Sequence, residues 1–108
     1  KGEVVQIKDK TKNKKLKIPH ISWGKIFLNN KSDYEGKLNF DYLDLEYYFV
    51  HSFLALAKEK SSILAYCNYE DVLIPAIVMK DNVLGCQFHP EKSGNNGLNF
   101  LKNVINKW

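Results

Sequence analysis

Four apolar runs rich in aromatic and β-branched residues limit the fold of this chain more than any other feature. The runs cover residues 46–53 (EYYFVHSF), 62–66, 73–79 and 83–88. Short polar stretches separate the last three, and Asp81-Asn82 is a plausible two-residue hairpin turn. Aromatic and β-branched residues favour strands. The pattern therefore predicts that residues 46–53 form a strand buried on most sides and that the last three runs form an antiparallel meander.

The pattern changes to that of a helix after His89-Pro90. Apolar residues then recur at three- and four-residue spacing, which is typical of a helix with one buried face. This apolar stripe consists of Gly97, Phe100, Leu101, Val104, Ile105 and Trp108, and the expected exposed positions are Asn99, Lys102, Asn103, Asn106 and Lys107. We therefore expect a closing helix, with Trp108 packed in the core.

The first 18 residues combine two short strand candidates with a lysine-rich loop. Residues 4–8 and 16–18 are the candidate strands, and the polar residues 9–15 suit a hairpin loop between them. A basic arm that binds nucleic acid or phosphate is an alternative for such a segment. The segment lacks interleaved aromatic residues, however, and the chain contains no arginine. We therefore favour a solvated hairpin tip and expect no nucleic-acid partner.

The composition favours a globular protein over a disordered or membrane-spanning one. The chain has 108 residues, 44% of them hydrophobic, which fits one globular domain and argues against disorder. No apolar stretch reaches the ~20 residues that a membrane span needs. Its first residue is Lys1, and an apolar run begins at Val4, so we expect the chain to be a piece cut from a longer one. A cytoplasmic protein without membrane attachment is the expectation.

Neither the cysteines nor the histidines show the spacing of a metal site. Cys67 and Cys86 form no paired motif and are expected to be reduced, small apolar residues. His20, His51 and His89 lie far apart in the sequence. We therefore expect no metal and no cofactor.

The string QFHPEKS, residues 87–93, holds the densest group of chemically active side chains. Side chains alternate along a strand, so an extended backbone through Pro90 would direct His89 and Glu91 to the same side. A carboxylate beside an imidazole fixes the tautomer and leaves the other ring nitrogen able to accept a proton. An ordinary surface pair is the alternative for a bare His-x-Glu.

Three motifs together resemble one protein family. QFHPEKS matches the signature of the class I, or triad, glutamine amidotransferases. The strings IPHISW at residues 18–23 and YFVHSF at 48–53 are similar to the PHxGW and YFVHSY elements of one branch, the glutaminase subunits of imidazole glycerol phosphate synthase. Their order and spacing also fit, and the similarity covers nearly the whole chain.

The resemblance implies an α/β fold in which residues 1–108 are the C-terminal half of a single domain, contributing antiparallel strands and the final helix. In that family a cysteine thiolate attacks the side-chain amide of glutamine, and the residues matching His89 and Glu91 act as base and orienter. The cysteine belongs to a Gly-x-Cys-x-Gly elbow. Neither Cys67 nor Cys86 has that glycine setting. The nucleophile is therefore expected in an N-terminal half that this chain lacks.

The resemblance also gives roles to positions outside the catalytic pair. Ser52 and Phe53 match the segment whose backbone receives the amino-acid end of glutamine, although a strand cap and a core residue remain the alternative. His51 is interpreted as a buried, hydrogen-bonded histidine that holds its strand end to a neighbour. His20 is expected to fix its loop.

A partner surface is implied at Trp23, Tyr48 and Lys92, which match residues facing the cyclase barrel near the mouth of the ammonia passage. A core position is the alternative for the two aromatic residues, and Lys92 is expected to be exposed. Ser22 stands where the family motif usually carries glycine, and Gly24 stands where asparagine is common. These departures predict a loop backbone that differs from that of the family at this point.

The expected function is hydrolysis of glutamine to glutamate and ammonia, with ammonia passed to a cyclase subunit that makes imidazole glycerol phosphate in histidine biosynthesis. Two alternatives remain open. A related glutaminase could supply ammonia to a partner that amidates surface sugars, which Ser22 and the lysine-rich segment keep in consideration. The chain could also be a non-catalytic binding module that lacks the nucleophile half.

Overall fold

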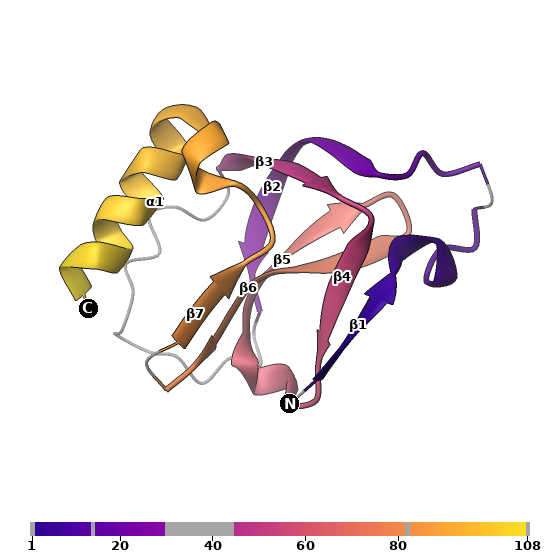
Figure 1. The fold of residues 1–108 in the computed structure, drawn as a ribbon, viewed down its shortest axis with the longest axis horizontal. Coiled ribbons are helices and arrows are strands. Elements are labelled where there is room, and N and C mark those ends of the chain that lie inside the picture. Colours follow the sequence, from indigo (N-terminus) through magenta and orange to yellow (C-terminus); the bar gives the residue numbers. More distant parts are fainter. Residues whose placement is uncertain (1, 14, 30–44, 82, 108) are drawn as a thin grey trace.

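The computed structural model describes residues 2–13, 15–29, 45–81 and 83–107. Its strands are β1 (Gly2–Gln6), β2 (His20–Leu28), β3 (Glu46–His51), β4 (Phe53–Ala57), β5 (Ile63–Tyr69), β6 (Val72–Lys80) and β7 (Val83–Cys86). The helices are α1 (Gly94–Lys107) and the short 3₁₀ turns η1 (Ile7–Asp9), η3 (Lys60–Ser62) and η4 (Pro90–Lys92). Figure 1 shows α1 at one side of the molecule and β1 with β4 at the other.

The strands of the described residues form two antiparallel sheets. The larger has the order β3-β2-β5-β6-β7, and the smaller pairs β1 with β4. The predicted meander is confirmed from β5 to β7, where Lys80 pairs with Val83 across the expected turn. Asp81 has a positive φ of 55° in that turn, and Asn82 lies outside the described residues. A sheet-dominated structure with a closing helix is the α/β arrangement expected from the sequence.

The predicted N-terminal hairpin is wrong. Residues 16–18 form no strand, and β1 instead pairs with β4, placing Gln6 opposite Phe53. The 3₁₀ turn at Ile7–Asp9 ends β1 and buries Ile7 completely. Leu16 and Ile18 pack against the core from a loop. Burying these apolar side chains in the common core outweighs a local pairing that would leave one face of the hairpin exposed.

Strand β2 was not predicted. The strand predicted at residues 46–53 is divided between two strands, β3 and the start of β4. The sequence of β2, HISWGKIFL, includes a glycine and a lysine that interrupt its apolar run, but buried and more exposed residues alternate along it. Its pairing with both β3 and β5 supplies the stability that the local pattern does not indicate. The run at residues 46–53 breaks at Ser52, where the chain leaves the larger sheet and enters β4.

The closing helix is confirmed and begins at Gly94, before the expected stripe. Gly94 has a positive φ of 62°, a backbone conformation that favours glycine. Phe100 is buried, whereas Ile105 is 70% exposed, contrary to its expected place on the buried face. Val104, one residue earlier, packs against the core. Trp108 lies outside the described residues.

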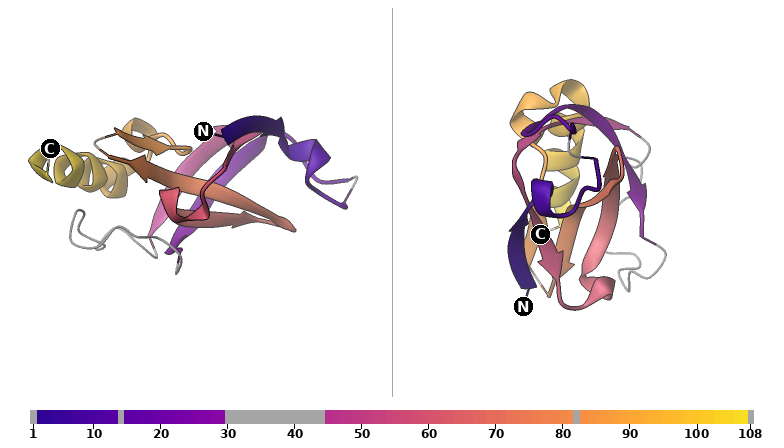
Figure 2. Two further views of the ribbon diagram at one scale, coloured as in Figure 1. Left: turned by 90° about the horizontal axis from the view of Figure 1, so that it is seen from below. Right: turned by 90° about the vertical axis from the view of Figure 1, so that its right-hand side faces the viewer.

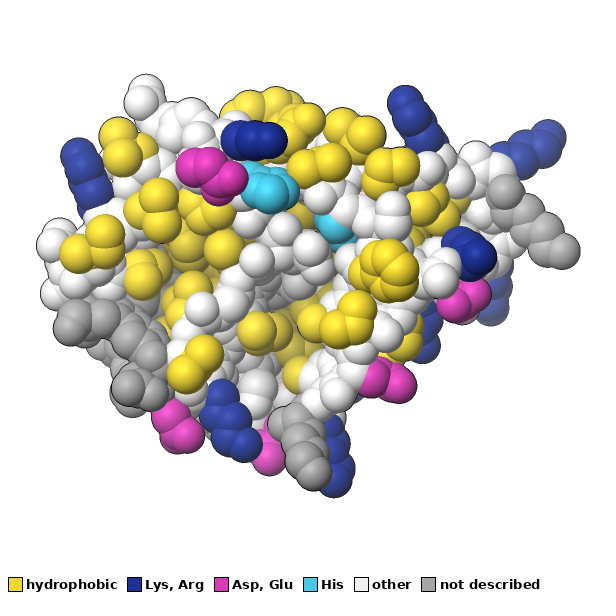
Figure 3. Space-filling model, viewed as in Figure 1, with side chains coloured by type: hydrophobic (Ala, Val, Ile, Leu, Met, Phe, Trp, Pro, Cys, Tyr) yellow, Lys and Arg dark blue, Asp and Glu magenta, His cyan; other side chains and the backbone are white. Residues whose placement is uncertain are grey.

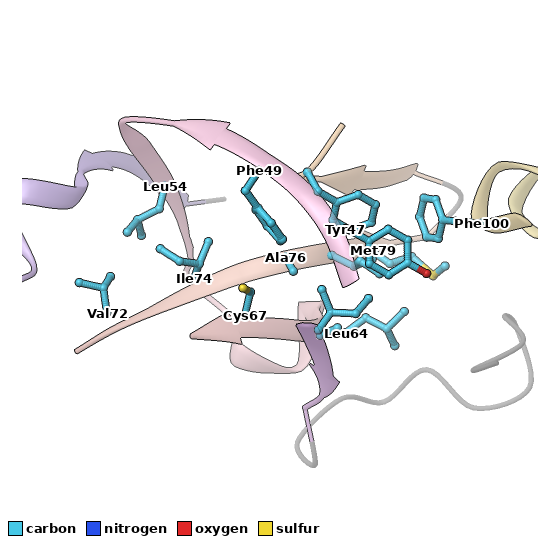
Figure 4. Packing of buried hydrophobic residues seen from close by; sticks show 14 of the residues in the cluster. Tyr47, Phe49, Leu54, Leu64, Cys67, Val72, Ile74, Ala76, Met79 and Phe100 are labelled. Atoms are coloured by element: carbon cyan, nitrogen blue, oxygen red, sulfur yellow. The ribbon is translucent and has the colours of Figure 1, made fainter. Parts of the chain in front are cut away.

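The core lies between the two sheets and extends to α1. Strand β4 contacts β6, and Figure 2 shows the β1–β4 ribbon as a layer against the larger sheet. Figure 4 shows Phe49 of β3 above Ala76 and Cys67, Tyr47 of β3 above Leu64, and Phe100 reaching in from the helix. Phe88 joins this aromatic group, with ring centroids 4.4 Å from Tyr47 and 5.2 Å from Phe100. The chain is thereby fixed just before His89.

Candidate active site

The two residues before His89, Gln87 and Phe88, are fixed to the rest of the fold. Gln87 donates its amide hydrogen to the carbonyl of Ala76 at 2.8 Å, and the ring of Phe88 is 3% exposed in the aromatic group. The amide of His89 then donates to the carbonyl of Tyr48 on β3 at 2.9 Å. The backbone that carries the imidazole is therefore anchored to β6, the core and β3 in three consecutive residues.

His89 and Glu91 form the predicted pair, but in a different backbone geometry. Nδ1 of His89 lies 3.0 Å from Oε2 of Glu91. The extended backbone considered for residues 89–91 does not continue through Pro90, because Pro90–Lys92 form the 3₁₀ turn η4, whose first position suits the fixed φ of proline. Figure 3 shows a histidine beside an acidic and a basic side chain at the surface. The tight turn brings together two side chains that an extended strand would also place on one side.

The tautomer of His89 follows from this contact. Hydrogen bonds from the Glu91 backbone amide and from His89 lower the pKa of the Glu91 carboxyl, so it is ionised and can only accept at neutral pH. Nδ1 of His89 is then the donor, and Nε2 of the neutral ring is the acceptor. The imidazole side chain is 38% exposed. The pair presents a basic nitrogen at an accessible surface.

Ser93, which the sequence analysis did not single out, locks the turn. Its hydroxyl is the acceptor for the amide of Tyr48 at 2.8 Å and donates to the carbonyl of His89 at 2.6 Å. The side chain is 1% exposed. Serine caps turns in this way because its hydroxyl both donates and accepts. The sequence signal that could have identified Ser93 was its position at the end of the QFHPEKS string.

Gly97 lets α1 pack directly against η4, the turn that carries Glu91. A Cβ atom at this position would lie 1.9 Å from the carbonyl oxygen of Pro90, a distance that only glycine avoids. The amide of Gly97 donates to the carbonyl of Ser93 at 3.2 Å. The helix therefore supports the turn that carries Glu91 by backbone contact.

Neither cysteine is prepared to act as a nucleophile. Burial raises the pKa of the Cys67 thiol to about 11, and burial together with the charge of Glu91 raises the pKa of the Cys86 thiol to about 11. Both cysteines are free. Because the thiolate is the reactive form, the raised pKa values make both thiols poor nucleophiles at neutral pH. This agrees with their interpretation as structural residues.

Ser52 and Phe53 lie where the chain passes from β3 to β4. The amide of Ile7 donates to the carbonyl of Ser52 at 2.9 Å, which makes Ile7 and Ser52 a hydrogen-bonded pair. Hydrogen-bonded and non-hydrogen-bonded pairs alternate in antiparallel sheets. The next pair, Gln6 and Phe53, therefore leaves the amide and carbonyl of Phe53 pointing away from β1. The Phe53 side chain is 49% exposed, so it does not fill the core.

Trp23 and Tyr48 form one aromatic pair, and Lys92 is exposed near them in η4. The two aromatic residues are directly opposite each other on β2 and β3, with ring centroids 5.8 Å apart. Trp23 is 48% exposed and Tyr48 is partly buried, so neither is a core residue. The hydrogen bond from His89 to Tyr48 brings η4 alongside this pair. The structure thus brings the turn with the His89–Glu91 pair and the expected partner residues to one region.

His20 and His51 are hydrogen-bonded to each other, with Nδ1 of His20 2.9 Å from Nε2 of His51. His20 also contacts the Ser22 hydroxyl, and His51 contacts the carbonyl of Phe53. Sequence reasoning treated these histidines separately and did not predict the link. The described part of the chain contains no group of three or more metal-binding side chains. Among the described residues, no helix is both long and apolar enough to cross a membrane.

Comparison with known proteins gives a consistent family assignment. The profile of the family "Glutamine amidotransferase class-I" matches residues 2–108. The imidazole glycerol phosphate synthase subunit HisH of Lactococcus lactis is 45% identical over 102 residues, covering 94% of this chain and 46% of that protein. The HisH subunits of Bacillus subtilis and Pyrococcus furiosus are 40% and 36% identical, covering 94% and 95% of this chain and 46% and 48% of those proteins.

The chain thus spans about half the length of the curated relatives that it matches. The family match nevertheless covers nearly all of it and includes the turn with the His89–Glu91 pair. The fold and the sequence comparisons agree, and the chain belongs to the class I glutamine amidotransferase family.

Proposed function

We propose that this chain is the C-terminal half of a glutaminase subunit that hydrolyses glutamine to glutamate and ammonia, and that ammonia passes to a cyclase subunit making imidazole glycerol phosphate. The observation that carries the proposal is the 3.0 Å contact between His89 and Glu91 on an anchored turn. The similarity to HisH subunits supports the choice of synthase. Such a biosynthetic enzyme would work in the cytoplasm.

The proposed reaction assigns one proton path to the pair. Nε2 of His89 accepts the proton of a cysteine thiol in the N-terminal half, and the thiolate attacks the amide carbon of glutamine. The imidazolium then gives this proton to the leaving nitrogen, so that ammonia departs and a thioester remains. Water hydrolyses the thioester to glutamate with His89 again as base. Glu91 accepts a hydrogen bond from Nδ1 throughout and stabilises the charged ring.

The backbone at Ser52 and Phe53 is proposed to hold the amino-acid end of glutamine. This proposal is supported by the orientation of the Phe53 amide and carbonyl away from β1. An amide can bind the substrate carboxylate, and a carbonyl can accept from the substrate ammonium. The exposed Phe53 side chain would border the bound molecule.

Replacing Glu91 with glutamine in the full-length subunit is expected to lower glutaminase turnover by about 5- to 30-fold. This is the difference between a charge-assisted and a neutral hydrogen bond to the ring. The amide can still accept from Nδ1, so the ring keeps part of its orientation. Steady-state release of glutamate is the measurement. Turnover at the wild-type rate would show that the Glu91 charge is not used.

The proposed partner is a barrel-shaped cyclase subunit that binds the surface at Trp23, Tyr48 and Lys92. The half-exposed Trp23, paired with the partly buried Tyr48, suits an interface anchor, and Lys92 is exposed in the turn that follows the hydrogen bond from His89 to Tyr48. Lys92 would form an ion pair with a carboxylate of the partner. The proximity of this surface to His89 would place the ammonia source near the contact.

Reversing the charge of Lys92 to glutamate is expected to weaken association with the cyclase by roughly 10-fold or more, because like charges would then meet at the contact. Affinity by calorimetry and the ratio of cyclase product to glutamate are the measurements. Lys80→Glu is the matched control, since this exposed residue ends β6 at the hairpin to β7. Equal affinity and coupling for both variants would remove Lys92 from the interface.

A further inference from the structure

An apolar groove lies between β4 and β7, and β6 forms its floor. Strand β6 contacts both of these strands, and Figure 1 shows β4 and β7 on either side of it. The groove has a wider part of about 420 Å³ and a narrower part of about 200 Å³ that reaches Gln87. Ala55, Val78 and Gly85 line both parts, so the two are continuous. Figure 3 shows this face hollowed below the histidine side chains, with apolar side chains around the hollow.

The strands that border the groove carry apolar side chains on both faces. In β4, Leu54 is buried in the core, whereas its neighbours Phe53 and Ala55 point to the opposite face and are exposed. Strand β6 is an uninterrupted apolar run from Val72 to Met79. Strands that are apolar on both faces are typical of a sheet that is covered on both sides. The core covers one side of these strands, so we expect the side with the groove to be covered as well.

One end of the groove lies beside the groups assigned to the proposed reaction. Gln87 lines the narrower part, and His89 follows it by two residues. Ala55 lines the same part, and Phe53, whose backbone is proposed to hold glutamine, precedes it by two residues. A segment that lies in this part of the groove is therefore adjacent both to the proposed base and to the proposed substrate-binding backbone.

The proposed reaction needs one group from outside residues 1–108, the thiol that gives its proton to His89. Neither Cys67 nor Cys86 suits this role, because burial is the main cause that raises the pKa of both thiols. In the curated relatives, about half of the length lies outside the part that this chain matches. A segment of that size must be held so that its cysteine reaches Nε2 of His89. The groove ends beside His89 and offers an apolar surface for this contact.

We propose that the groove is the docking surface for the N-terminal half of the subunit: an apolar segment of that half packs on Ala55, Val78 and Gly85 and brings its cysteine to the proposed base. The proposal rests on the proposed glutaminase function, which requires that half. The contact lies at the end of the groove that reaches Gln87. Val83, at the opposite end of β7, lies outside the contact and keeps its side chain exposed.

Thiol labelling of the full-length subunit tests whether Ala55, which is exposed in residues 1–108, is covered. In Ala55→Cys, the new thiol is expected to react with a maleimide at least about 10-fold more slowly in the native subunit than in urea, because it is accessible only when the contact opens. Leu73→Cys is the matched control. Leu73 lies on β6 outside the groove and is 48% exposed, so its thiol should react at similar rates in both states. Equal native and unfolded rates for Ala55→Cys would overturn the proposal.

Photo-cross-linking of the full-length subunit identifies what covers the groove. A diazirine amino acid of the size of leucine replaces Val78, and mass spectrometry identifies the captured peptide. A mixture of unlabelled and nitrogen-15-labelled subunits separates capture within one molecule from capture between two. We expect a peptide that precedes residue 1 in the same molecule. Capture confined to residues 1–108, or capture of a second copy, would overturn the proposal.

Neither measurement depends on activity. An inactive wild-type subunit would therefore reject the proposed glutaminase function, and labelling and cross-linking would still decide whether the N-terminal half covers the groove.

Discussion

Replacing His89 with alanine in the full-length subunit is expected to lower glutamine-dependent turnover by about 100- to 10,000-fold, because the thiol loses its proton acceptor. The His89 ring contacts Glu91 at the surface and takes no part in the described core, so the fold should survive. Glutamate release and cyclase product, both from glutamine, are the measurements. The loss should exceed that of Glu91→Gln.

Added ammonia provides the control for this experiment. His89→Ala leaves the active site of the cyclase untouched, so synthesis from ammonia should continue when synthesis from glutamine fails. Purified residues 1–108 provide a second control, because the raised pKa values keep both of their cysteine thiols protonated near neutral pH. Glutaminase activity at the wild-type rate in His89→Ala, or turnover by residues 1–108 alone, would show that another group is the base or nucleophile.

Replacing Phe88 with alanine is expected to lower the free energy of unfolding of the full-length subunit by about 3 to 5 kcal/mol, the usual cost of deleting a buried aromatic ring. Phe88 is 3% exposed and contacts the rings of Tyr47, Phe49 and Phe100. The measurement is the shift of the urea unfolding midpoint. Glutaminase activity should fall as well, because His89 follows directly in the chain.

Val83→Ala is the matched control for Phe88→Ala. Val83 begins β7, which ends two residues before Phe88, and is 68% exposed, so its truncation should change stability by less than about 0.5 kcal/mol. Phe88→Leu, which refills part of the space, should lie between the two. A loss below about 1 kcal/mol in Phe88→Ala would mean that the aromatic group is not essential to the site.

The local sequence predicted those parts of the fold whose pattern repeats. The apolar runs of β5, β6 and β7 have the residue types and lengths typical of strands, and the apolar spacing of α1 is that of a helix. These elements could therefore be predicted without knowing their neighbours in the fold. Strand β2 was not predicted because its glycine and lysine weaken the pattern, and its stability comes from two neighbouring strands. The wrong hairpin had the same origin, since β1 finds its partner about 50 residues away.

In the candidate site, too, the local contact was predictable from the sequence and the long-range contact was not. The string at residues 87–93 indicated that His89 and Glu91 act as a pair, because two residues at this spacing meet in an extended strand and also in the 3₁₀ turn that occurs. Their family also followed from short motifs. The anchoring of Ser93 to Tyr48 could not be predicted, because it joins segments 45 residues apart.

The sequence by itself determined the chemistry of this protein: an imidazole with a carboxylate two residues away, and cysteines without the setting of a nucleophile. Only the tertiary structure decided which groups these side chains meet. The His20–His51 contact depends on the register of two strands, which their separate sequences do not specify. The direction of its hydrogen bonds depends on the Phe53 carbonyl, a backbone group common to every residue. Such a group becomes specific only when the fold places a particular side chain against it.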